Sequence, residues 1–378
     1  MSRPTDHANL DLKQLHLDVA KGKSDGKVIW QPRIGCWYTD KRFAGEPLPE
    51  PYEHLSVPDI FRSLNCSARI YEFNACFERV DHPGVKRYSR KIDDMHDEAV
   101  IETPVGTINS IMQKNTSNAG IFPKKWFMET EEDLKVAIWI EENSTWRFNQ
   151  DTYDQVEREW HGLGAPTMFM PRVNVQSLYV NDMGVENATY AMVDYPDTVE
   201  AYFRALDDSH DRLIDVINAS CIDIINFGDN VHAGTLPPRL FKKYVLPAYQ
   251  RRNEKLHAAG KFTHAHWDGD VKPLLPLARE TGLDGIEAIT PVPQGDVTIE
   301  EVREALGDKM FLVDGIAAIL FDTIFPEQDL IDQTKKILDL FAPRLILGIS
   351  DEISSTGDIE RIRTVGRIVD DYNAGVSK

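Results

Sequence analysis

The stretch KFTHAHWDGDVKPLLPLARETGLDGIEAI (residues 261–289) decides the fold. It holds two short strand candidates, KFTHAH (261–266) and LDGIEAI (283–289), separated by a helical pattern that ends at Gly282. Parallel neighbouring strands need a crossover connection, which is usually a helix, so this alternation is typical of a parallel sheet. We therefore predict a strand–helix–strand unit here.

The same alternation extends through the second half of the chain and, less regularly, through the first half. Eight strand–helix units predict one closed (β/α)8 barrel of the TIM type, forming a single domain over residues 1–378. Residues 1–26 are expected to form an N-terminal extension, and about 90–160 an excursion over the barrel with a hairpin at 97–113. The eight predicted strands are 27–33, 68–73, 165–173, 221–227, 261–266, 283–289, 309–315 and 344–350.

Composition narrows the class of protein. The chain has 61 acidic and 42 basic residues and a formal net charge of -19. Such a surface repels phosphate backbones and anionic lipids, so we expect neither a nucleic-acid nor a membrane partner. The polar N-terminus, the lack of an apolar run of about 18 residues and four cysteines without CxxC spacing predict a reduced, cytoplasmic protein.

Polar and aromatic side chains follow the predicted strands at their C-terminal ends, where barrel enzymes carry their chemistry. Asp229 and His232 follow the fourth strand and could move a proton, although Asp229 could equally cap a helix in an ordinary turn. Asp314 could likewise only shape a turn. The predicted substrate-binding residues are Arg33, Trp37, Tyr38, Asn74, Trp267 and Asp314.

The pair His264-x-His266 is the most informative feature. Side chains of a strand alternate, so both imidazoles face one side, and with carboxylates on neighbouring strands they suit a divalent metal. Glu287, inside the apolar GIEAI, and Asp351 are the predicted further ligands. Two alternatives stay open: the histidines are a core residue and a substrate contact, or Glu287 pairs with backbone or an arginine.

Other cofactor motifs are missing from the sequence. It contains no GxGxxG, no Walker loop, no HExxH and no GxSxG. The sequence therefore gives no support to a nicotinamide or nucleotide cofactor.

The order of elements over 221–375 resembles the uroporphyrinogen decarboxylase-like superfamily, and the resemblance continues more weakly over 27–220. It is carried by DIINFGDNVHAGTLPPRLFKKYVLPAYQ, by the histidine-bearing strand, and by KMFLVDGI and LILGISDE. The superfamily includes zinc-dependent methyltransferases that act with corrinoid proteins. In these, His264 matches the ligand histidine, His266 stands where a cysteine would be, and 350–351 lies near a second cysteine position.

The resemblance implies a metal-dependent methyltransferase that moves a methyl group between a small methylated substrate, such as an O-methyl compound, and a corrinoid protein. Zinc or another divalent metal would be the cofactor, the corrinoid would be carried by a partner, and self-association stays open. The alternative is a metal-free carboxy-lyase acting on a carboxylated substrate. A non-catalytic binding protein is a third class. Of the two arginines that grip the substrate in the decarboxylase, only Arg33 remains, because Trp37 replaces the other.

Overall fold

A computed structural model describes residues 10–376 of the chain. The predicted N-terminal extension therefore lies partly outside the described residues. Within them, α1 (Leu12–Lys21) begins at Asp11, whose side chain accepts a hydrogen bond from the backbone of Gln14. No helix in this part of the chain is long and apolar enough to cross a membrane.

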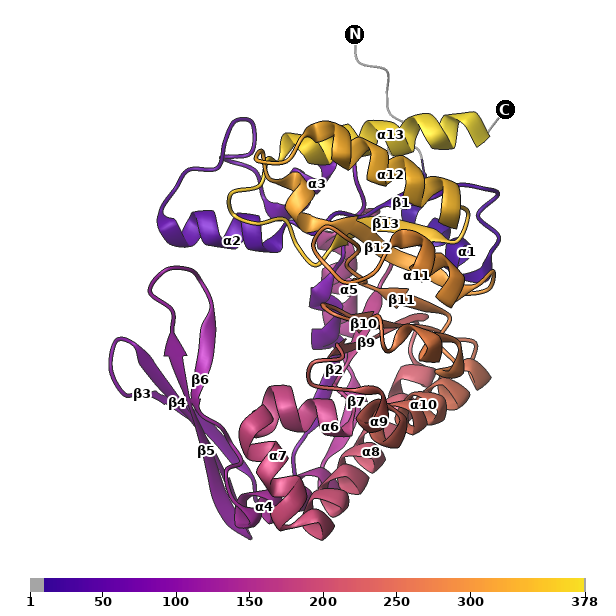
Figure 1. Ribbon diagram of the computed structural model, residues 1–378. Helices are drawn as coiled ribbons and strands as arrows, with labels where there is room; N and C mark the ends of the chain where they lie inside the picture. Colours follow the sequence, from indigo (N-terminus) through magenta and orange to yellow (C-terminus); the bar gives the residue numbers. More distant parts are fainter. Residues whose placement is uncertain (1–9, 377–378) are drawn as a thin grey trace.

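A curled, seven-stranded parallel sheet forms the centre of the molecule, with the order β1-β13-β12-β11-β10-β9-β8 (Figure 1). This confirms the α/β class and is consistent with a TIM-type barrel. Seven of the eight predicted strands are present. They are β1 (Ile29–Trp30), β8 (Thr167–Met170), β9 (Ile224–Val231), β10 (Phe262–Trp267), β11 (Gly285–Glu287), β12 (Phe311–Ala317) and β13 (Leu345–Ser350).

The second predicted strand, 68–73, is wrong. Residues 71–76 form a 3-10 helix, η2 (Tyr71–Cys76), and the residues before it are extended without belonging to the sheet. The backbone amide of Ser67 still donates to the carbonyl of Trp30 in β1 (2.8 Å), and Asn74 accepts from the amide of Phe169 in β8 (2.8 Å). The segment therefore lies between the two edge strands, but it makes too few backbone hydrogen bonds to form a strand.

Helices follow the strands of the second half as predicted. Thr298 and Glu301 form the expected capping box at the start of α11 (Ile299–Leu306). The helix predicted before Gly282 shortens to the 3-10 helix η5 (Leu275–Glu280), because Pro273 and Pro276 remove backbone donors. The main helices around the sheet are α2 (Gly35–Ala44), α3 (Val57–Leu64), α8 (Pro196–Ala219), α10 (Leu246–Ala258), α11 (Ile299–Leu306), α12 (Glu327–Phe341) and α13 (Glu360–Val376).

Smaller helical segments precede α8, α10 and α12. Two of them, η3 (Leu178–Asp182) and η4 (Phe241–Val245), are π-helical turns, in which each backbone hydrogen bond spans one residue more than in an α-helix. These segments are α6 (Asn174–Ser177), η3 (Leu178–Asp182), α7 (Val185–Asp194), α9 (Pro238–Leu240), η4 (Phe241–Val245) and η6 (Ala318–Phe321).

An antiparallel sheet occupies the region of the predicted excursion. The hairpin expected over 97–113 corresponds to β4 (His96–Thr103) and β5 (Gly106–Lys114), which pair antiparallel. They are flanked by β3 (Lys86–Lys91) and β6 (Ile121–Lys125), and Figure 1 shows this sheet standing to the left of α4 and the barrel strands. The remaining elements here are β2 (Phe77–Val80), α4 (Glu131–Glu142), β7 (Thr145–Phe148) and α5 (Gln150–Glu159).

Candidate active site

A buried arginine lies at the centre of the polar side chains inside the barrel. Arg69 reaches from the segment before η2 to Glu287 of β11 (Nη1 to Oε1, 3.0 Å) and to Asp314 of β12 (Nη2 to Oδ1, 2.8 Å). Its Nε donates to Gln31 (3.4 Å). All three charged side chains are nearly inaccessible to solvent. The guanidinium therefore ties three separate segments together.

The two histidines of β10 contact the same carboxylate. Nδ1 of His264 lies 3.1 Å from Oε2 of Glu287, and Nδ1 of His266 lies 2.8 Å from Oε1. Asn226 of β9 also donates to Oε2. The prediction that both imidazoles face one side of the strand thus agrees with the geometry. Burial alone would raise the pKa of Glu287, but Arg69 and the histidine hydrogen bonds hold it well below its usual range.

Asp314 is the second carboxylate bound to Arg69, and its electrostatic balance is different. Burial raises the pKa of Asp314 to about 6. The positive charge of Arg69 lowers this pKa, and the negative charge of Glu287 raises it further. Its Oδ2 has no hydrogen-bond partner among the described residues. The backbone of Asp314 is left-handed, with φ 74°. The predicted substrate-binding residue is therefore a buried member of the charge network.

An aromatic cavity of about 130 Å³ adjoins this network, next to the loop that follows β1. Arg33 and Arg69 both line it, so two guanidinium groups lie at one small cavity. Arg33 is also 3.4 Å from Asp351 and 3.5 Å from Glu352. The remaining aromatic and acidic lining residues are Tyr38, Phe61, Tyr71, Glu72, Trp160 and Glu352.

The four predicted metal ligands are only partly brought together. His264, His266 and Glu287 meet, but the Asp351 side chain is 55% exposed and pairs with Arg33. A cation bound at Glu287 would share an oxygen with a guanidinium 3.0 Å away, and like charges repel. Among residues 10–376, no three His, Cys, Asp or Glu side chains are arranged to hold a metal ion. The side chains present do not fit the predicted zinc site.

The two residues predicted to move protons lie outside the lining of the cavity. Asp229 is fully buried and accepts hydrogen bonds from the amide of Val173 (2.7 Å) and the hydroxyl of Tyr249 (2.7 Å). Those bonds join β9 to the start of α6 and to α10, but Asp229 lies within β9, so a helix cap in an ordinary turn does not describe it. His232 lies in the loop after β9, where its Nε2 is 3.2 Å from the hydroxyl of Thr235.

The other predicted substrate contacts divide into two groups. Tyr38 lines the cavity with Arg33. Trp37 and Trp267 are fully buried in the core, where Trp37 packs edge-on against Tyr52 and Trp267 against Phe241. Asn74 binds the backbone of β8 through its side chain.

Sequence reasoning missed Arg69, Asn226 and Tyr71. Arg69 carries a visible signal, because it is a charged residue inside the apolar run ARIYEF. Its partners could not be named in advance, since Glu287 lies 218 positions further along the chain.

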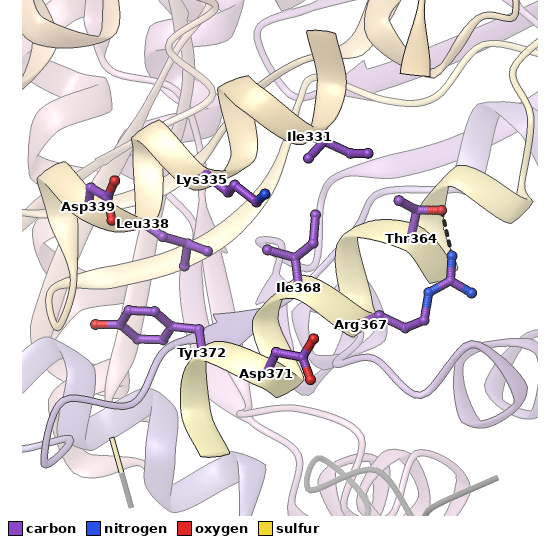
Figure 2. Close-up of a pocket in the computed structure, with 9 residues that line it drawn as sticks. All are labelled: Ile331, Lys335, Leu338, Asp339, Thr364, Arg367, Ile368, Asp371 and Tyr372. Carbon is purple, nitrogen blue, oxygen red and sulfur yellow. Dashed lines mark hydrogen bonds between the residues drawn. The ribbon is translucent and has the colours of Figure 1, made fainter. Parts of the chain in front are cut away.

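A larger groove of about 590 Å³ lies on the outer helical layer, between α12 and α13 (Figure 2). Figure 2 shows aliphatic side chains mixed with charged ones, and Arg367 donating to Thr364 within α13. None of the strand-end residues described above lines this groove. The cavity beside Arg33 and Arg69 is therefore the candidate active site.

Known proteins resemble the chain in family and in fold. The model of the family "Uroporphyrinogen decarboxylase (URO-D)" matches residues 176–372, just over half of the 378 residues. No curated protein matches the chain.

Among solved structures, a methyltransferase from Methanosarcina mazei superposes with a TM-score of 0.54 at 14% identity, covering 95% of this chain and 98% of that one. A B12-independent methionine synthase from Shewanella sp. W3-18-1 gives a TM-score of 0.37 at 14% identity, covering 93% and 96%. At these identities the first superposition describes a shared fold, and the second is too loose to support an inference.

Proposed function

Since this chain belongs to the uroporphyrinogen decarboxylase (URO-D) family, we propose that it is an enzyme that removes a methyl group from a small O-methyl compound. The active site is the cavity beside Arg33 and Arg69. The methyl acceptor is the reduced cobalt of a corrinoid carried by a partner protein. The fold shared with a methyltransferase over 95% of the chain supports this choice of reaction.

The observation that carries the proposal is the pairing of two guanidinium groups with an aromatic wall in a cavity of about 130 Å³. Pockets for drug-sized ligands measure about 300–1,000 Å³. The cavity therefore suits a small aromatic ring and is too small for a tetrapyrrole with eight carboxylates. Tyr38 and Trp160 would contact the faces of the ring.

The chemistry follows from where negative charge develops. The acceptor's electron pair attacks the methyl carbon, the carbon–oxygen bond breaks, and its electron pair stays on the oxygen. That oxygen then takes a proton from water. Arg33 and Arg69 can stabilise the developing oxyanion by charge-assisted hydrogen bonds in a site sheltered from water. No step is routed through a metal bound by this chain, because the side chains at Glu287 do not fit one.

A second candidate, the metal-free carboxy-lyase, is favoured by the same two arginines. A guanidinium binds a carboxylate as readily as an oxyanion. The two candidates differ in their products, since the lyase releases carbon dioxide and leaves a methoxy group intact.

The test uses the purified full-length chain with methoxybenzoates and chemically reduced cobalamin. We expect methylcobalamin and the free phenol, identified by chromatography. Arg33→Gln should lower the rate by about 100–1,000-fold, the range for loss of one oxyanion donor. Arg367→Gln, in the outer groove, is the matched control and should leave the rate unchanged. Carbon dioxide release without any methylcobalamin would refute methyl transfer and favour the lyase.

A further inference from the structure

We propose that the guanidinium of Arg69 is the permanent cation of the barrel interior and takes the place at Glu287 that the His-x-His motif predicts for a divalent metal. The proposal concerns the proposed active site but does not depend on which reaction occurs there. It rests on the contacts of Glu287, of the two histidines and of Arg69 itself.

The acceptor capacity of Glu287 is already taken up. Oε1 accepts from Arg69 (3.0 Å) and His266 (2.8 Å), and Oε2 accepts from Asn226 and lies 3.1 Å from Nδ1 of His264. A carboxylate offers about four lone-pair sites, two on each oxygen. Three donors and the ring nitrogen of His264 already surround them in the described structure, so a metal could bind Glu287 only by displacing one of these neighbours.

His266 presents the wrong ring atom to a metal at this carboxylate. An ionised carboxylate only accepts hydrogen bonds, so the Nδ1 atom of His266 that faces it carries a proton. A metal ligand needs an unprotonated nitrogen. Nδ1 of His264 lies 3.1 Å from Oε2 of Glu287 and 3.1 Å from the side-chain amide nitrogen of Asn226, so it already has two polar neighbours. His266 therefore acts together with Arg69 to hold the charge of the carboxylate.

Arg69 is held more firmly than an exchangeable ion would be. Its side chain is 6% exposed, and it bridges Glu287 and Asp314 with one Nη each while Nε donates to Gln31. Three of its five N–H groups are used in this way, which leaves two. Arg69 also lines the cavity. It therefore offers a ligand a fixed positive charge that a chelator cannot remove.

The first test is a zinc titration of the untagged, full-length chain after dialysis against a chelator. We expect no saturable binding at one equivalent by calorimetry, and no rise of the melting temperature when zinc is added. One equivalent of bound zinc that is lost in His266→Ala would overturn the proposal. Failure of methyl transfer in the assay above would leave this result untouched, so the two proposals fail separately.

The second test compares thermal melts of Arg69→Met, Glu287→Gln and the double variant. Each single change leaves a buried charge without its partner and should lower the melting temperature by several degrees. The double variant should melt above the value expected from adding the two shifts. Arg69→Lys keeps the charge but not the fork that reaches both carboxylates, so it should melt between Arg69→Met and the parent.

Strictly additive shifts would overturn the pairing of Arg69 with Glu287. If Arg69→Met does not fold, Glu287→Gln with the zinc titration of the parent chain still decides the matter. A melting temperature of Glu287→Gln equal to that of the parent would then count against the proposal.

Discussion

A single added methyl group should test whether the charge network inside the barrel is as tightly packed as its contacts indicate. Gly348 in β13 lies opposite Gly315 of β12. A Cβ at Gly348 would collide with Oδ1 of Asp314, the atom that Arg69 binds, and would lie 2.7 Å from the backbone carbonyl oxygen of Gln31. The carbonyl belongs to backbone that is hydrogen-bonded to β13, so it cannot move aside freely.

Gly348→Ala should therefore reduce the free energy of unfolding by about 1–3 kcal/mol, the usual cost of overpacking a core. It should also lower activity, because the carboxyl of Asp314 must turn away from Arg69. Urea unfolding curves of both proteins give the difference in the free energy of unfolding, provided that the dependence on urea concentration has the same slope in both.

Gly375→Ala in α13 is the matched control, because a Cβ there meets nothing within 4 Å. It should leave stability unchanged or raise it slightly, since alanine favours helix. If Gly348→Ala unfolds within about 0.5 kcal/mol of the parent, the range of ordinary surface changes, the network has room that these contacts do not show.

Two further substitutions test groups outside the cavity. Burial raises the pKa of Asp182 to about 6, above its unfolded value of 3.8, so the folded form is favoured at low pH and loses stability as the pH rises from 4 to 7. Asp182→Asn should therefore gain stability relative to the parent as the pH rises from 4 to 7. The gain should be about 2 kcal/mol once solvent screening of the partly exposed side chain is allowed for. Unfolding measured at both pH values checks this, and a stability difference that is the same at both would contradict the raised pKa of Asp182. Tyr249→Phe removes the 2.7 Å hydrogen bond to buried Asp229 and should cost about 1–3 kcal/mol of stability without changing the rate per folded molecule; a large loss of kcat would return Asp229 to a catalytic role.

The strands of the second half could be predicted because each is a short run bounded by its own helical crossover segment. The side of the strand that each side chain faces was also predictable. Side chains alternate along a strand, so His264 and His266 face one side, and both contact Glu287. The segment at 68–73 failed for a physical reason: its residues have the composition of a strand, but few of their backbone groups find partners in the neighbouring strands.

The structure does not test metal binding itself, but the contacts of Glu287 bear on the metal prediction. Two histidines and a glutamate on adjacent strands indicate a site that must balance negative charge, and this inference agrees with the structure. The sequence could not show which cation balances it, because Arg69 comes from a segment 218 positions before Glu287. A buried carboxylate was expected to be paired with a cation or to bind a metal. Glu287 is paired with Arg69, which is the arginine alternative that the sequence left open.

The backbone around this network indicates that it is held against local strain. Ala288, Asp314 and Asp351 have left-handed backbones, with φ of 66°, 74° and 72°; Ala288 and Asp351 directly follow β11 and β13, and Asp314 lies in the middle of β12. A left-handed conformation costs a residue with a Cβ roughly 1–2 kcal/mol. Such conformations persist only where the surroundings impose them, and they gather at functional sites. Here the surroundings are visible: Asp314 is bound by Arg69, Asp351 faces Arg33, and Ala288 directly follows Glu287. The strain therefore coincides with the two arginines that line the cavity, as expected if the fold places these cations for chemistry.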